Sequence, residues 1–284
     1  WFAKTDYRDS VTGPFLNRNS FATYVGIGLA VALALAASRW LRRPHRRHGD
    51  RQDEAADWRL ALLLLLTALL AVTLVMTRSR GGFYSFGAAI VAGGAMLVLS
   101  GALRGRRLGI ALAGALVALV AVLAASGGGL AGRFEKGADS VEASRGNIFG
   151  PTITAIRARP LTGYGLGSFQ GVFEAVNDGR LYKDGYHLDK AHNTYLELAL
   201  EGGIPAAIAL SLCLLALAAP CILALLRRRS IAFGLGGSIA AIGVATHALF
   251  DFSLQMPAVA VAFVALLGAC SAQSLRSLGE HAQS

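Results

Sequence analysis

Seven long apolar stretches that contain no Asp, Glu, Lys or Arg alternate with polar segments along the chain. They cover residues 19–38, 60–77, 81–103, 108–132, 202–226, 230–250 and 252–275, and they are 18 to 25 residues long. A helix needs about 20 apolar residues to cross the hydrocarbon core of a bilayer. The pattern therefore predicts an all-α fold, a polytopic transmembrane helical bundle with about seven helices in this chain.

Arginines cluster in three of the polar connections. Seven lie in residues 39–59, three in 104–107 and three in 227–229. Short loops rich in Lys and Arg stay in the cytoplasm, and counting the apolar stretches between the clusters places all three on one side. We therefore expect the opposite, extracytoplasmic side to receive residues 1–18, the turn at 78–80, a large and partly helical loop at 133–194, and the turn near Asp251.

The composition agrees with this topology and argues against two other classes of protein. Hydrophobic residues make up 54% of the chain and the mean hydropathy is +0.52, which excludes a soluble domain. The net charge is +10, but residues 133–194 hold eight Lys and Arg against seven Asp and Glu, so the excess is cytoplasmic. We interpret it as a topology signal and a contact with anionic membrane lipids, and we expect no nucleic-acid partner.

Three segments describe the expected organisation of the chain. Residues 1–132 hold four spans with basic cytoplasmic loops, residues 133–194 form the periplasmic loop domain, and residues 195–284 hold three spans. The sequence starts at Trp1 without an initiator Met or a signal peptide. We expect it to be the C-terminal part of a larger membrane protein.

The large loop contains an amphipathic run followed by a glycine-rich turn. Residues 148–158 place apolar side chains on related faces, namely Phe149, Ile153 and Ile156, and Pro160 is expected to end this helix. The turn has glycines at 163, 165 and 167, which indicate positive φ angles or a close approach to another segment. A tight turn is favoured over a nucleotide-binding loop, because no strand-loop-helix unit surrounds it.

Two polar junctions carry candidate chemistry. Arg78 and Arg80 lie in the short outer turn, where they either snorkel to the interface or meet an anion. His192 and Asn193 close the large loop at the start of a membrane helix, and imidazole titrates near neutral pH, as a general base requires. His187, five residues earlier, is the alternative base.

Two further sets of polar residues are assigned lesser roles. His247 and Asp251 are four residues apart, so we expect them on one helical face as a supporting hydrogen-bonded pair. The three cysteines lie in apolar stretches and are expected to pack as small apolar residues. Loop acids are scattered and no His-Glu-x-x-His or Asp-x-Asp occurs, so we expect no metal and no cofactor.

Five short segments resemble the O-antigen ligase and polymerase family of bacterial polyprenyl-linked glycan transferases. They are residues 17–22, 79–82, 160–167, 192–197 with 201–205, and 247–252 with 255–257. Each segment is short, but their order, spacing and common expected side of the membrane are shared with the family. The likeness spans residues 14–270.

The resemblance implies a membrane glycosyltransferase in the bacterial cytoplasmic membrane with its active face outside. Such an enzyme moves a glycan from an undecaprenyl-pyrophosphate donor to a hydroxyl of a glycan, lipid or protein acceptor. By motif match it assigns His192, Arg80 and Arg145 as catalytic residues, with Arg157 and Arg159 as nearby alternatives to Arg145. The further expected substrate-binding residues are Asn193, Arg78, Arg157, Arg159 and Tyr164.

The chemistry suits these residue types. An arginine fork binds phosphate oxygens in bidentate fashion and stays protonated, so arginines can hold a pyrophosphate leaving group without a divalent ion. The contrasting class is a polysaccharide or lipid transporter, or a flippase component. A transporter would place ionisable residues near mid-membrane, whereas here they gather on one outer face, which favours the enzyme.

Overall fold

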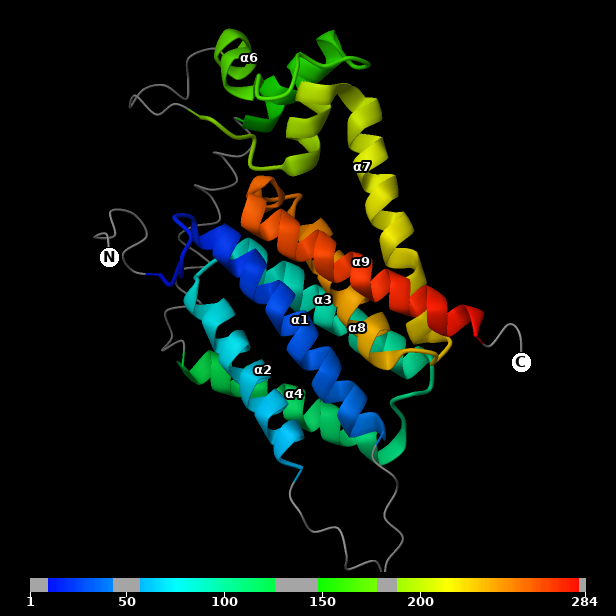
Figure 1. Cartoon of the computed structure of the whole chain (residues 1–284). Helices are drawn as coiled ribbons and strands as arrows, with labels where there is room; N and C mark the ends of the chain where they lie inside the picture. Colours follow the sequence, from blue (N-terminus) through cyan, green and yellow to red (C-terminus); the bar gives the residue numbers. More distant parts are fainter. Residues whose placement is uncertain (1–9, 43–56, 126–147, 178–187, 281–284) are drawn as a thin grey trace, which may run out of the picture. The chain divides into compact units, whose positions relative to one another are not determined.

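The computed structural model describes residues 10–42, 57–125, 148–177 and 188–280, and every regular element in these ranges is a helix. This confirms the all-α prediction. The elements, shown in Figure 1, are α1 (Arg18–Arg42), α2 (Trp58–Met76), α3 (Arg80–Leu99), α4 (Gly105–Ala125), a helix over residues 148–158, α6 (Phe169–Val176), α7 (Thr194–Leu226), α8 (Ile231–His247), the 3₁₀ helix η1 (Ser253–Gln255) and α9 (Pro257–Gly279).

The chain is a multi-pass membrane protein. Five helices, α1, α2, α3, α7 and α9, are long and apolar enough to cross a bilayer, and α8 is a shorter apolar helix. Helix α4 occupies most of the predicted stretch at 108–132, whose end beyond Ala125 lies outside the described residues. Each of the seven predicted stretches thus contains a helix, and among the described residues five of these helices meet both the length and the apolar composition of a span.

The connection between the last two helices is longer than the sequence pattern indicated. Helix α8 ends at His247 and α9 begins at Pro257, although apolar residues continue on both sides of Asp251. The backbone N–H groups of Leu249 and Phe250 donate to the carbonyls of Thr246 and His247, so the chain turns there. Pro257 suits the first position of α9, since it has no N–H to leave unpaired.

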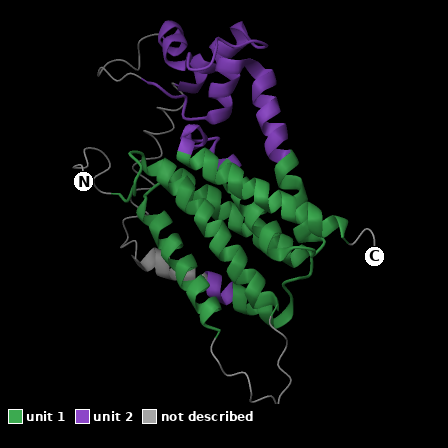
Figure 2. Cartoon of the chain, viewed as in Figure 1, with its two compact units in different colours: residues 1–111, 216–244, 258–284 green, residues 112–215, 245–257 purple. Residues whose placement is uncertain are grey.

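Two compact units divide the chain (Figure 2). Unit 1 contains residues 1–111, 216–244 and 258–284, and unit 2 contains residues 112–215 and 245–257. Within unit 1, α1 packs against α2 and α3. Phe86 of α3 is fully buried between Gly26 of α1 and Gly243 of α8, where a β-carbon on either glycine would clash with its ring. Small residues of this kind let membrane helices approach closely.

The cysteines are free thiols with different surroundings. Cys221 and Cys270 are buried, and a β-carbon at Gly237 would clash with both, so these two cysteines pack as predicted. Cys213 is instead exposed on the surface of α7.

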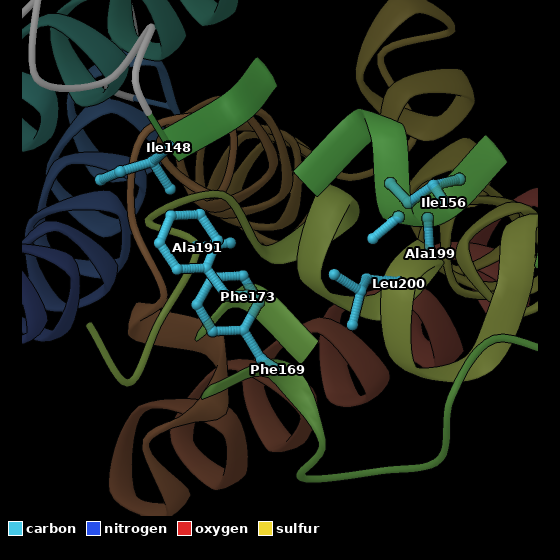
Figure 3. Packing of buried hydrophobic residues seen from close by; sticks show 8 residues of the cluster. Ile148, Ile156, Phe169, Phe173, Ala191, Ala199 and Leu200 are labelled. Atoms are coloured by element: carbon cyan, nitrogen blue, oxygen red, sulfur yellow. The ribbon is translucent and has the colours of Figure 1, made fainter. Parts of the chain in front are cut away.

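A separate hydrophobic core holds unit 2 together (Figure 3). It is formed by Ile148, Ala155, Ile156, Phe169, Phe173, Ala191, Ala199 and Leu200, with the rings of Phe169 and Phe173 stacked at 5.4 Å. Of the three apolar residues expected on related faces of the 148–158 helix, Ile156 is buried and Phe149 packs against the core, whereas Ile153 is exposed. The buried face consists of residues 148, 152, 155 and 156, which follow one another at helical spacing.

Candidate functional site

Helix α7 is broken at its tenth residue, and the break is closed by another segment. Gly203 has a φ of 80° and a ψ of 166°, which ends the first part of α7 and starts the second. We call residues 160–167 the glycine turn. Its Tyr164 and Gly165 N–H groups donate to the carbonyls of Leu200 and Glu201 at 3.0 and 2.8 Å. The Ile204 N–H donates to the Pro160 carbonyl at 2.8 Å. The backbone groups that lose their helical partners at the break are therefore paired with the glycine turn.

Two glycines permit this contact between backbones. A β-carbon on Gly163 would clash with the Glu201 backbone, and one on Gly203 would clash with the Leu161 carbonyl. Both residues have positive φ, as do Gly165 and Gly167. The prediction that these turn glycines adopt positive φ or approach another segment closely is therefore confirmed.

His192 lies immediately before α7 in a left-handed conformation, with a φ of 53°. This conformation is uncommon for a residue with a side chain and costs about 1–2 kcal/mol. Its ring lies 5.2 Å from the ring of Phe252 in an edge-to-face arrangement, and the residue is half-buried. Asn193, the next residue, caps α7 because its side-chain oxygen accepts from the N–H groups of Tyr195 and Leu196, each at 3.0 Å.

A buried carboxylate holds the segment before His192. Glu197 is 2% exposed, and it accepts from Lys190 Nζ at 3.1 Å and from the Ala191 N–H at 2.8 Å. The neighbours of His192 on both sides are thus fixed by hydrogen bonds. Sequence reasoning gave Glu197 and Lys190 no role, although an acidic residue in the first turn of a helix that follows a basic residue was a usable signal.

Glu201 is a second carboxylate to which the sequence gave no role. Its Oε1 accepts from the Phe169 N–H at the start of α6, at 3.1 Å. The first part of α7 therefore binds two other segments through its carboxylates. Glu197 accepts from the segment before His192, and Glu201 accepts from the start of α6.

The turn after α8 joins the same unit through Thr194. The Thr194 N–H donates to the Ala248 carbonyl at 2.9 Å, and its hydroxyl donates to the Asp251 carbonyl at 3.0 Å. Asp251 and His247 are buried, and the Ser253 hydroxyl donates to the Asp251 carboxylate. Because α8 ends at His247, this pair lies across a turn and not on one helical face as its spacing had indicated.

The arginines of the described loop lie near the glycine turn. The Arg159 guanidinium stacks over the Tyr164 ring at 4.8 Å, and the Tyr164 hydroxyl donates to the Ala155 carbonyl at 3.3 Å. Arg157 is exposed on the preceding helix. Unit 2 therefore contains seven of the predicted site residues, which are Arg157, Arg159, Tyr164, His192, Asn193, His247 and Asp251.

Arg78 and Arg80 belong to unit 1 and are exposed at a rigid turn. Thr77 Oγ1 accepts from the Ser79 N–H, and the Ser79 hydroxyl oxygen accepts from the Gly82 N–H, each at 3.2 Å. Arg80 is the first residue of α3, where backbone N–H groups favour an anion. Arg145 and His187 lie outside the described residues.

Among the residues that the structure describes, no three His, Cys, Asp or Glu side chains are placed to hold a metal ion.

A known protein family matches about half of the chain. The family model described as O-antigen ligase matches residues 65–211, which is 147 of the 284 residues. The matched region includes the Arg78–Arg80 turn, the glycine turn and the segment from Lys190 to Ile204. No curated protein and no solved structure matches the chain significantly.

Proposed function

The chain belongs to the O-antigen ligase family, whose members transfer glycans, and we propose that it moves a glycan from an undecaprenyl-pyrophosphate donor to an acceptor hydroxyl. The proposed location is the extracytoplasmic face of the bacterial inner membrane, in line with the arginine-rich connections on the other side. The arrangement of the residues around His192 is the observation that best supports the proposal. A half-buried imidazole belongs to a residue in a strained backbone conformation, and hydrogen bonds fix both of its neighbours.

His192 is the proposed general base. One ring nitrogen of the neutral imidazole takes the proton from the acceptor hydroxyl as its oxygen attacks the anomeric carbon of the donor. The bond between that carbon and the pyrophosphate oxygen breaks, and undecaprenyl pyrophosphate leaves with the electron pair. A positioned base contributes about 10²–10⁴-fold in rate. Strain at this residue supports the role, because strained residues cluster at functional sites.

Arginines are proposed to stabilise the leaving group. Negative charge grows on the pyrophosphate in the transition state, and preorganised cations stabilise it more there than in the ground state. Arg80 and Arg145 are the proposed catalytic arginines, with Arg78, Arg157 and Arg159 as further phosphate contacts. Tyr164 and Asn193 are proposed to orient the glycan, and His247 and Asp251 to support the segment that carries His192.

The reaction itself tests the proposal. The purified full chain, reconstituted in phospholipid vesicles, is given an undecaprenyl-pyrophosphate-linked glycan and an acceptor, and the product is measured by gel together with released undecaprenyl pyrophosphate. We expect turnover that continues in excess EDTA, because arginines replace the divalent ion. No transfer with any acceptor class would contradict the function, and turnover abolished by EDTA would contradict the arginine clamp.

A further inference from the structure

The second part of α7 has the length of one membrane crossing. Residues 204–226 span about 34 Å at 1.5 Å per residue, against about 30 Å for the hydrocarbon core. The far end leads directly into the arginines at 227–229, a typical membrane border. The first part of α7 carries the buried Glu197, which pairs with the partly exposed Lys190 of the preceding segment, and charged groups are costly in hydrocarbon. The membrane therefore ends near Ile204.

The glycine turn is fixed to this end of the span. Its Pro160 carbonyl accepts from the Ile204 N–H at 2.8 Å, and the Gly163 and Gly203 backbones are in direct contact. A segment bonded to the first residue of the crossing lies at the depth of that residue. The glycine turn is thus at the border between hydrocarbon and headgroups.

The side chains that the turn displays are unusual for a loop in water. Leu161 is 73% exposed and Leu166 is 82% exposed, and Ile204 beside them is 42% exposed. Arg157 and Arg159, on the segment that enters the turn, are exposed as well. Exposed apolar tips with a basic rim are the composition of segments that lie in a membrane interface.

We infer that the glycine turn is an interfacial anchor, with Leu161 and Leu166 inserted into the leaflet at the Ile204 end of α7 and with Arg157 and Arg159 against lipid phosphates. The bilayer is the occupant that fits, because the exposed leucines belong to a turn bonded to the first residue of the crossing and the arginines complement anionic headgroups. One consequence rests on the proposed function: the anchor holds Arg159 and Tyr164 at the level where the donor's pyrophosphate lies.

The depth of the turn can be measured without any turnover. Single cysteines replace Leu161 or Leu166 in the full chain, in a Cys213→Ala background because Cys213 is exposed. Gln170→Cys, on the exposed side of α6 in the same unit, is the matched control. Each variant carries a bimane label in phosphatidylcholine vesicles with phosphatidylglycerol, and quenching by a lipid-borne nitroxide is compared with quenching by aqueous iodide.

The inference predicts that lipid nitroxide quenches the labels at 161 and 166 several times more than the label at 170, and that iodide shows the reverse order. Iodide quenching at 161 and 166 equal to that at 170 would overturn it. Labels at 161 and 166 shielded from both quenchers would also overturn it, since a protein segment would then cover the turn. Lipid quenching in an enzyme that does not transfer glycan would contradict only the proposed function.

A second arm tests the basic rim. Removing an arginine near an anionic leaflet should lower the ratio of lipid-exposed to water-exposed label by about fivefold. Arg157→Gln and Arg159→Gln should each show this loss in vesicles with phosphatidylglycerol and little change in phosphatidylcholine alone. Equal quenching by lipid in both variants and the parent would show that the arginines do not contact lipid phosphates.

Discussion

At the scale of single residues, sequence motifs identify candidate functional side chains but not the neighbours that fix their positions. His192 is conspicuous in the sequence as a titratable residue at a helix start. The carboxylate that fixes the segment before it, Glu197, lies five residues later inside an apolar run. Its role depends on the path that the chain takes between Lys190 and Thr194, and a local pattern carries little information about that path.

The buried Glu197, which accepts from Lys190 and Ala191, is expected to be important for stability. Glu197→Ala leaves the buried Ala191 N–H without its acceptor, which costs about 1–3 kcal/mol, whereas the Lys190 ammonium, 28% exposed, can turn to solvent. Thermal unfolding in detergent measures the loss. The control is Arg276→Ala, because Arg276 and Glu280 form a pair whose side chains are 74% and 61% exposed, worth about 0.3–0.5 kcal/mol. Equal losses in the two variants would contradict the account.

Arg80 is expected to require its fork geometry and not only its charge. Lysine keeps the positive charge but cannot bind two phosphate oxygens in a plane, so Arg80→Lys should lose most transfer activity while expression is unchanged. Initial rates of the reconstituted variants measure this, with Arg276→Lys on α9 as the control. Near-normal rates in both Arg80→Lys and Arg80→Ala would remove Arg80 from the mechanism.

At the scale of elements, the break in α7 is the feature that the sequence indicated only in part. The predicted apolar stretch begins at Gly202, beside the break, and the glycines at 163, 165 and 167 predicted a tight turn. That these two segments bond to each other could not be inferred, because some forty residues separate them and each signal is satisfied by a turn alone. The same limit applies to the end of α8, where an apolar run continues past the last helical residue.

Because the backbone of Gly203 contacts that of Leu161, adding one methyl group at Gly203 is expected to destabilise unit 2 strongly. Gly203→Ala places a β-carbon against the Leu161 carbonyl at a positive φ, so it should open the joint and destabilise unit 2. Gly171→Ala is the matched control, since Gly171 lies inside α6 with open space around it, and alanine there should stabilise the helix by about 0.5–1 kcal/mol. Hydrogen exchange of residues 160–167 in the two variants measures the difference. Unchanged protection in Gly203→Ala would contradict the contact.

At the scale of the whole molecule, the membrane bundle was predictable because a span has a strict physical requirement. About 20 residues without charge leave few alternatives to a crossing helix, and among the described residues five of the predicted stretches form helices long and apolar enough to cross a bilayer. The candidate site was predictable as a set of residue types, since a base and arginines suit pyrophosphate chemistry. Its geometry was not, because the relevant hydrogen bonds connect the large loop, α7 and the turn after α8.

The orientation of the chain is the next expectation at this scale. The arginine clusters predict that residues 133–194 face the extracytoplasmic side and that residues 39–59 and 227–229 face the cytoplasm. In a Cys213→Ala background, a membrane-impermeant thiol reagent should label Gln170→Cys in intact spheroplasts and label Arg229→Cys only after lysis. The opposite order of labelling would reverse the topology.

The dependence of the transfer rate on His192 and on pH tests the central claim most directly. The full chain and its His192→Ala variant are reconstituted with the same donor and acceptor, and initial rates are measured across neutral pH. Because only the neutral imidazole accepts a proton, the rate of the parent should fall as the pH is lowered, and the variant should be slower by about 10²–10⁴-fold with an unchanged unfolding temperature. A His192→Ala variant with substantial turnover and the same pH profile as the parent would contradict the account.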